Sequence, residues 1–198
     1  MDNWKTMYKV DVPEGKKGDW EVSRFTVTEK DVAISNMRAM FHPGGRTIDP
    51  GTYTRLTRSG SVIMSDTQAE VCDHIGFMGG CSGNVLIAGL GLGVVLQGCL
   101  RNPKVTAVTV VEKSQDVYDL VAPHYLRMEP VKLQIYVADI FEWNQPKGVH
   151  YDWFWADIWD DICADNLLEM SQLKRRFGRK ATHKGFWCEA LCRRYNRK

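Results

Sequence analysis

The segment VLIAGLGLGVVLQGCL, residues 85–100, constrains the fold of this chain more than any other part of it. Small and aliphatic residues at 85–89 predict a buried parallel strand. Gly89, Gly91 and Gly93 then occupy alternate positions before an apolar stretch that carries no charge. A strand that leads through glycines into a helix is how α/β proteins bring a nucleotide-like ligand close to the backbone. The segment therefore predicts an α/β fold with a ligand site at the glycine loop.

A second apolar run, VTAVTVVE, ends in Glu112, nineteen residues after Gly93. A carboxylate at that place can accept hydrogen bonds from ribose hydroxyls. Val94 stands where the GxGxxG fingerprint of nicotinamide-binding loops has its third glycine, which argues against a dinucleotide. The loop and the acid together indicate a ligand that contains adenosine.

The chain after residue 84 alternates runs of strand type with runs of helix type. This alternation predicts a Rossmann-like fold with a mostly parallel central sheet and helices on both faces. Ser114 and Asp165 are the expected N-terminal caps of two helices, and Gly178 is expected just past the end of the second. The expected strands are 84–88, 105–111, 132–138 and 151–156, and the expected helices are 93–101, 114–123, 166–177 and 184–195.

Residues 1–65 differ from the rest and predict a small β-rich appendage, while 66–198 form the predicted Rossmann-like domain with a basic C-terminal helix. The appendage is rich in glycine and proline, and Arg58–Ser61 predicts a hairpin turn. Residues 31–41 predict a short helix. The expected strands of the appendage are 20–28, 52–58 and 61–64.

A helix is expected to open at Ser65, where the appendage ends. The Ser65 side chain can bind the exposed N–H groups of the first turn, and Gln68, three residues later, completes a capping box. This helix should extend to about Met78 and end at Gly79 and Gly80, because glycine is common at helix ends.

Composition bounds the class of protein further. The chain has 198 residues, of which 44% are hydrophobic and 25% charged, as in ordinary soluble globular proteins. No apolar run approaches the ~20 residues that span a bilayer, and the N-terminus lacks the apolar core of a signal peptide. We therefore expect a cytoplasmic protein that does not associate with membranes.

The six cysteines show no CxxC pair and no zinc-finger spacing with histidines. Without a secretory signal they are expected to be free thiols that mostly fill the core. Cys188 and Cys192 lie four residues apart and would share a helix face, where packing is favoured over metal binding. No metal site is expected.

The net charge of +2 conceals an asymmetry between the two ends of the chain. Residues 174–198 carry ten Lys or Arg and one acid, Glu189, whereas the remainder carries 16 basic and 23 acidic residues. A basic end can bind nucleic acid or another anionic partner. A solvated helix face, or packing against the acidic part of the chain, is favoured because no RNA- or DNA-binding motif accompanies the charge. The sequence leaves open whether the chain forms a homodimer.

Acidic residues follow three consecutive expected strands, beside the glycine loop. They are Glu112, Asp139, and Asp157 with its neighbours Asp160 and Asp161. Ligands of parallel α/β sheets bind beyond the carboxyl ends of the strands. Because these ends meet at one edge of the sheet, the acids and the glycines are expected to form a single ligand site.

Residues 60–173 resemble the class I S-adenosylmethionine-dependent methyltransferase fold. The resemblance implies that Gly89, Gly91 and Gly93 lie under the methionine and ribose of the ligand. It also implies that the acid after the second strand, Glu112, holds the ribose hydroxyls.

The same resemblance assigns an adenine subsite to the end of the next strand. Asp139 would accept a hydrogen bond from the adenine amino group, and Ile140 would pack against the ring. Lys113 stands where the family often has an apolar residue, and the aliphatic stem of Lys113 could pack there instead.

Within that fold the chain is similar to the spermidine synthase branch, through the stretch YDWFWAD at 151–157. The resemblance implies that Asp157 is the base that acts on an attacking amine and that Asp160 holds a polyamine. It places Asp73 and His74, in the lead-in helix, near the substrate. An aromatic residue such as Trp159 could stack on a flat substrate.

Three features depart from that branch. Leu92 stands where spermidine synthases carry an acid that anchors the aminopropyl ammonium, and Met64 stands where they carry a glutamine. The sheet edge that follows Phe177 is shortened, since about twenty residues remain there. The first two departures weaken aminopropyl transfer as the activity of this chain.

Three functions stay open at this point. The first is an S-adenosylmethionine-dependent methyltransferase that acts on a small substrate, such as an amine. Closely spaced acids favour an amine because they attract cations, and they raise each other's pKa, which suits a base. The second is an aminopropyltransferase that uses decarboxylated S-adenosylmethionine. The third is a non-catalytic binding protein that retains the fold.

Overall fold

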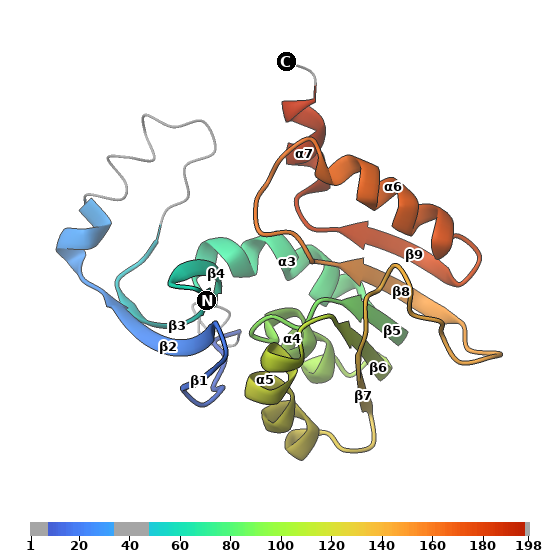
Figure 1. Cartoon of the computed structure of the whole chain (residues 1–198), viewed down its shortest axis with the longest axis horizontal. Coiled ribbons are helices and arrows are strands. Elements are labelled where there is room, and N and C mark those ends of the chain that lie inside the picture. The colour runs from blue at the N-terminus through green and yellow to red at the C-terminus, as the bar shows by residue number, and fades with distance from the viewer. Residues whose placement is uncertain (1–7, 34–47, 197–198) are drawn as a thin grey trace.

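The computed structural model describes residues 8–33 and 48–196, and within these ranges the chain forms two sheets (Figure 1). An antiparallel sheet has the order β1-β2-β3-β4, and a parallel sheet has the order β7-β6-β5-β8-β9. The strands are β1 Gly15–Lys17, β2 Trp20–Val27, β3 Gly51–Arg58, β4 Ser61–Ser65, β5 Gly83–Ala88, β6 Val105–Glu112, β7 Leu133–Val137, β8 Tyr151–Ala156 and β9 Ala181–Phe186. The helices are α3 Gln68–Gly80, α4 Val94–Arg101, α5 Gln115–Met128, α6 Asn166–Arg176 and α7 Glu189–Tyr195.

The central strand β5 separates two hydrophobic cores, because alternate residues of a strand face opposite sides of the sheet. Val85 and Ile87 pack with residues of α3, α4 and α5, whereas Leu86 and Ala88 pack with residues of α6 and α7. Figure 1 shows α4 and α5 on one side of the sheet and α6 and α7 on the other. The predicted α/β class, with helices on both faces and a β-rich N-terminal part, is confirmed.

The order of the parallel strands creates a switch point at the centre of the sheet. From β5 the chain adds β6 and β7 on one side, and it then returns to add β8 and β9 on the other. The loops that follow β5 and β8 therefore diverge, which leaves a crevice at the carboxyl ends of these neighbouring strands. The glycine loop follows β5, so the topology brings it to this crevice.

The antiparallel sheet contains the predicted hairpin between β3 and β4. Ser59 and Gly60 both have left-handed backbones, with φ of 50° and 81°, as a two-residue type I′ turn requires. A register shift opposite Leu56 and Thr57 makes a bulge in β4. The division of the chain into domains at residue 65 stays a prediction.

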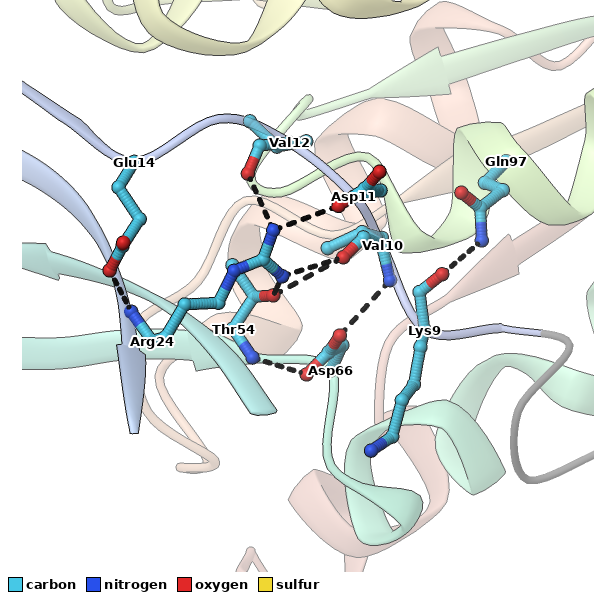
Figure 2. A network of polar contacts seen from close by, with 9 residues as sticks. All are labelled: Lys9, Val10, Asp11, Val12, Glu14, Arg24, Thr54, Asp66 and Gln97. Atoms are coloured by element: carbon cyan, nitrogen blue, oxygen red, sulfur yellow. Dashed lines mark hydrogen bonds and ion pairs between the residues drawn. The ribbon is translucent and has the colours of Figure 1, made fainter. Parts of the chain in front are cut away.

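A buried carboxylate ties the N-terminal segment to the antiparallel sheet (Figure 2). Asp66 accepts hydrogen bonds from the backbone N–H groups of Val10, at 3.0 Å, and Thr54, at 2.7 Å. Arg24 donates to the carbonyl oxygens of Val10 and Val12, and burial raises the pKa of Asp66. This network fixes the segment that leads into β1 against β3 and the start of α3.

The predicted start of α3 was wrong. Ser65 ends β4, and its N–H and hydroxyl bind the carboxylate of Glu70, so it does not cap the helix. The helix begins at Gln68 with Thr67 in the cap position. Pairing of Ser65 with Arg55 holds it in the strand, and this long-range contact overrides the local capping-box pattern.

The predicted last helix at 184–195 was also wrong in its first half. Residues 181–186 form β9, which pairs in parallel with β8, and the helix begins only at Glu189. Cys188 precedes it with a left-handed φ of 50°, so it does not share a helix face with Cys192. The local sequence of residues 181–186 did not indicate that this segment pairs with β8.

Three smaller predictions differ in detail from the structure. The helix α5 continues through Pro123 to Met128, because the buried Tyr125 packs beyond the proline. Asp165 stands at the start of α6 but makes no capping hydrogen bond, whereas Ser114 caps α5 as expected. Of the short helix expected at 31–41, residues 31–33 are helical and the rest lies outside the described residues.

No helix in the described part of the chain is long and apolar enough to cross a membrane. Among the same residues, no group of three or more His, Cys, Asp or Glu side chains is arranged to hold a metal ion.

Candidate functional site

A cavity of about 450 Å³ lies beyond the carboxyl ends of β5, β6, β7 and β8. The parallel sheet supplies one wall, and the antiparallel sheet supplies another through β2, β3 and β4. Of the residues predicted for the site, those that line this cavity are Gly89, Gly91, Glu112, Lys113, Asp139, Ile140, Asp157, Trp159 and Asp160. The fold therefore brings together most of the predicted ligand-binding residues.

The glycines of the loop are required by the protein's own packing. Gly89 has a φ of 93°, and a Cβ there would lie 2.1 Å from the carbonyl oxygen of Asp157. Gly93 has a φ of 79°, and a Cβ there would lie 2.2 Å from the ring of Tyr125. Gly93 does not line the cavity, so its place in the loop is explained by the contact with Tyr125.

The N–H groups of the loop are largely engaged inside the protein. Gly89 donates to the carbonyl of Val111, and Gly93 donates to the carbonyl of Leu90. Leu90 donates to Glu112, at 2.7 Å. Loops that bind phosphates direct such N–H groups at the ligand. The internal bonds of this loop suit a nucleoside better than a dinucleotide.

Glu112 is a fixed hydrogen-bond acceptor at the centre of the cavity wall. Its side chain is buried, and one oxygen accepts from the N–H of Leu90 while the other accepts from the N–H of Ser114, each at 2.7 Å. A carboxylate offers about four lone-pair positions, so each oxygen can accept a further hydrogen bond. Glu112 is thus oriented by the backbone and still able to bind two hydroxyl groups.

The next strand end carries an ion pair. The carboxylate of Asp139 lies 2.8 Å from the ammonium of Lys113, and it also accepts from the N–H of Phe141. The bond from Lys113 holds the pKa of Asp139 below its usual value and raises the pKa of Lys113. Ile140 and Phe141 line the cavity beside this pair. This end of the cavity combines a flat apolar surface with one carboxylate.

Asp157 pairs with a buried histidine from α3. The His74 Nε2 lies 3.4 Å from Asp157 Oδ2, and the two side chains are 2% and 16% exposed. The edge of the His74 ring meets Trp155, with the centroids 5.7 Å apart. Packing against Trp155 fixes the His74 ring beside Asp157, and of this pair only Asp157 lines the larger cavity.

A second cavity, of about 280 Å³, adjoins the first. The two cavities share Ile63, Met64, Asp157, Trp159 and Asp160. Glu70, His74 and Asp161 also line the second one. Asp73, predicted beside the substrate, lines neither cavity, and its carboxylate accepts from the indole N–H of Trp187 at 3.1 Å.

Asp160 is neutralised by a residue that the sequence did not single out. The guanidinium of Arg58, at the end of β3, binds the Asp160 carboxylate and also lies over the ring of Trp20. Trp159 donates its indole N–H to Glu169 at 2.7 Å. All the residues in these contacts line the larger cavity. No local sequence signal indicates Arg58, because its place at the cavity is set by the position of the antiparallel sheet β1–β4.

The basic C-terminal part is partly neutralised within itself. Glu189 binds Lys174 and Arg193, each at 2.6 Å, and Arg176 donates to the carbonyl of Trp143. Lys180 precedes β9, so it lies at the end of the sheet opposite the cavity. Binding of nucleic acid through residues 174–198 stays a prediction.

No family model matches this chain, and no curated protein sequence matches it. Among solved structures, TrmN from Thermus thermophilus is 14% identical, with 65% of this chain and 41% of that chain covered and a TM-score of 0.46. The spermidine synthase from Thermotoga maritima is 15% identical, with 57% and 43% covered and a TM-score of 0.43. An S-adenosylmethionine-dependent methyltransferase from Clostridium acetobutylicum is 17% identical, with 59% and 46% covered and a TM-score of 0.38. The chain spans less than half the length of each of these proteins.

Proposed function

We propose that this protein is an S-adenosylmethionine-dependent methyltransferase that acts on a small amine. The observation that carries the proposal is the arrangement of the two cavities. The larger one joins Glu112 to Asp139, and the smaller, acidic one meets it at Asp157. A donor and an acceptor bound in adjoining cavities would meet beside a carboxylate that can take a proton.

The residues of the larger cavity suit the nucleoside part of the donor. Glu112 would accept from the ribose hydroxyls, since its oxygens are held in place by two backbone N–H groups. Asp139 would accept from the adenine amino group, and Ile140 would cover the ring. When bound, S-adenosylmethionine supplies a methyl group activated by a sulfonium.

The smaller cavity suits an amine as the acceptor. Glu70, Asp157 and Asp161 place carboxylates around it, and these attract a cation. Asp157 would take the proton that an ammonium must lose before its nitrogen can act as a nucleophile. His74 is a positioning residue here, because it lies 3.4 Å from the Asp157 carboxylate in the wall of the same cavity.

Aminopropyl transfer is the second candidate, because Asp157 and Asp160 each line both cavities. It is the less favoured one. Asp160, which would hold the polyamine, already binds Arg58, and Leu92 is fully buried where an anchoring acid would be needed. Incubation with decarboxylated S-adenosylmethionine and putrescine tests it, since formation of spermidine would favour this candidate over methylation.

Titration calorimetry with S-adenosylmethionine and S-adenosylhomocysteine tests the proposed ligand, and heat of binding is expected with both. Transfer of labelled methyl groups to a panel of small amines tests the reaction. Binding without transfer to any amine would favour the non-catalytic alternative. Absence of binding to either compound would contradict the proposal itself.

The Asp157→Asn substitution tests the role of the carboxylate. It should lower the rate of methyl transfer by about 10²–10⁴-fold, the usual contribution of a general base, while ligand affinity changes little. Asp119→Asn, at an ion pair with Lys17 that lines neither cavity, is the matched control and should retain full activity. Equal rates for the two variants would remove Asp157 from the mechanism.

A further inference from the structure

The side chain of Met64 lies on the glycine loop. Its sulfur accepts a hydrogen bond from the N–H of Leu92, with 3.0 Å between nitrogen and sulfur. A Cβ built on Gly91 would lie 2.3 Å from the same sulfur. The thioether therefore rests directly against the backbone in the middle of the loop, and it contacts this backbone from the cavity side.

The bulge in β4 explains how Met64 reaches the loop. Neighbouring residues of a regular strand point to opposite faces, yet Ile63 and Met64 both line the larger cavity. Leu56 pairs with Met64 and Thr57 pairs with Val62, so Ile63 is the extra residue. A bulge re-aims the side chains around it, and here it turns two neighbours toward the ligand site.

The hydrogen bond from Leu92 to Met64 is the weakest of the loop bonds described above. The N–H groups of Gly89, Leu90 and Gly93 bind oxygen atoms of the protein. The N–H of Leu92 binds a thioether sulfur, which is a weak acceptor. A hydroxyl or carboxylate oxygen of a ligand would bind this N–H more strongly. The methionine side chain, with three rotatable bonds, can move aside to allow it.

Met64 also lies where the two cavities meet. It lines both of them together with Asp157. An adenosine held by Glu112 and Asp139 would direct a substituent on its 5′ carbon along the glycine loop toward Asp157. Such a path would pass over Gly91, and the Met64 sulfur rests against the backbone of that residue.

We propose that Met64 is a gate on the glycine loop, which selects ligands by the size of their 5′ substituent. Adenosine would bind with Met64 in place. A nucleoside with an aminocarboxypropyl-thio substituent would bind only after Met64 leaves Gly91 and Leu92. The gate rests on the proposed function, since it acts on the ligand proposed for the same cavity. It makes displacement of Met64 a condition for contact between donor and acceptor.

Calorimetry with adenosine and S-adenosylhomocysteine, on the wild type and on Met64→Ala, tests the gate. If the open side-chain position is populated about one tenth of the time, Met64→Ala should bind S-adenosylhomocysteine about tenfold more tightly. Adenosine affinity should change less than about threefold, because its binding does not need the open position. Val62→Ala, which shortens an exposed side chain of the same strand that lines neither cavity, is the matched control and should leave the ratio of the two affinities unchanged.

Methyl NMR of the wild-type protein labelled at methionine provides a second test. It follows Met64 itself, so it does not depend on a substitution that removes packing contacts. The Met64 resonance, assigned by its absence in Met64→Leu, should shift on addition of S-adenosylhomocysteine and stay in place on addition of adenosine. The gate would be contradicted, and the nucleoside site would not, if Met64→Ala increased the affinity for both ligands equally. An unchanged Met64 resonance with S-adenosylhomocysteine would have the same consequence. Failure of every variant to bind either ligand would overturn the nucleoside site and the gate with it.

Discussion

Each of three acids at the cavity is bound by a side chain of the protein. Asp139 binds Lys113 and the N–H of Phe141, whereas Asp157 binds His74, and Asp160 binds Arg58. The sequence predicted acids at these strand ends from the alternation of strands and helices. It did not predict their side-chain partners, because each of these comes from another element. The proposed roles of these acids therefore depend on how far a ligand can compete with the protein's own side chains.

Lys113→Met tests the ion pair at the adenine end. Lys113 lowers the pKa of Asp139, so the pair stabilises the folded protein at pH values above the ordinary Asp pKa. This stabilisation is lost as the pH falls through the lowered pKa. The wild type should be slightly more stable than the variant at neutral pH, and the difference should vanish at strongly acidic pH. Urea unfolding across this range measures it. A difference that grows toward acidic pH would contradict the assignment.

The elements of the parallel sheet were the most predictable part of the fold. The strands β5, β6 and β8 lie within about two residues of their predicted bounds, because burial on both faces gives them continuous apolar runs. The start of α3 and the strand β9 were mispredicted, since β-pairing partners far along the chain decide them. The glycine loop was predictable in part. Its sequence identified it, but nothing in that sequence indicated that Gly93 packs against Tyr125.

Gly93→Ala tests whether that glycine serves the fold. A left-handed backbone costs a non-glycine residue about 1–2 kcal/mol, and displacement of the buried Tyr125 ring adds about 1–3 kcal/mol. The free energy of unfolding in urea should fall by the sum of these. Gly76→Ala, in α3 with open space around it, is the control and should stabilise the protein by about 0.5–1 kcal/mol. Similar effects at both positions would contradict the packing argument.

At the scale of the whole molecule, the antiparallel sheet completes the site that the parallel sheet begins. Trp20, Arg58 and Met64 come from the antiparallel sheet and line the larger cavity. Asp66 holds the segment before β1 against β3, which fixes the position of this sheet at the start of α3. The shape of the cavity therefore depends on contacts between the two sheets.

Asp66→Asn tests this connection through its pH dependence. Burial raises the pKa of Asp66, so the stability it contributes is complete below the ordinary Asp pKa and is lost as the pH rises through the raised value. Chemical unfolding should show the wild type gaining stability relative to Asp66→Asn as the pH falls through that window. Asp66→Ala should cost about 1–3 kcal/mol for each of the two N–H groups left without an acceptor. A pH-independent difference between the wild type and Asp66→Asn would rule out the raised pKa.

The sequence by itself determined the α/β class, the glycine loop and the acids at three strand ends, because these follow from periodicity and spacing along a local stretch of chain. Only the tertiary structure decided which of these groups face the cavity and what they bind. It turned Asp73 toward Trp187, paired Asp160 with Arg58 and placed Met64 on Gly91. Each of these contacts joins residues far apart in the sequence, so their geometry is set by the packing of the two sheets and α3.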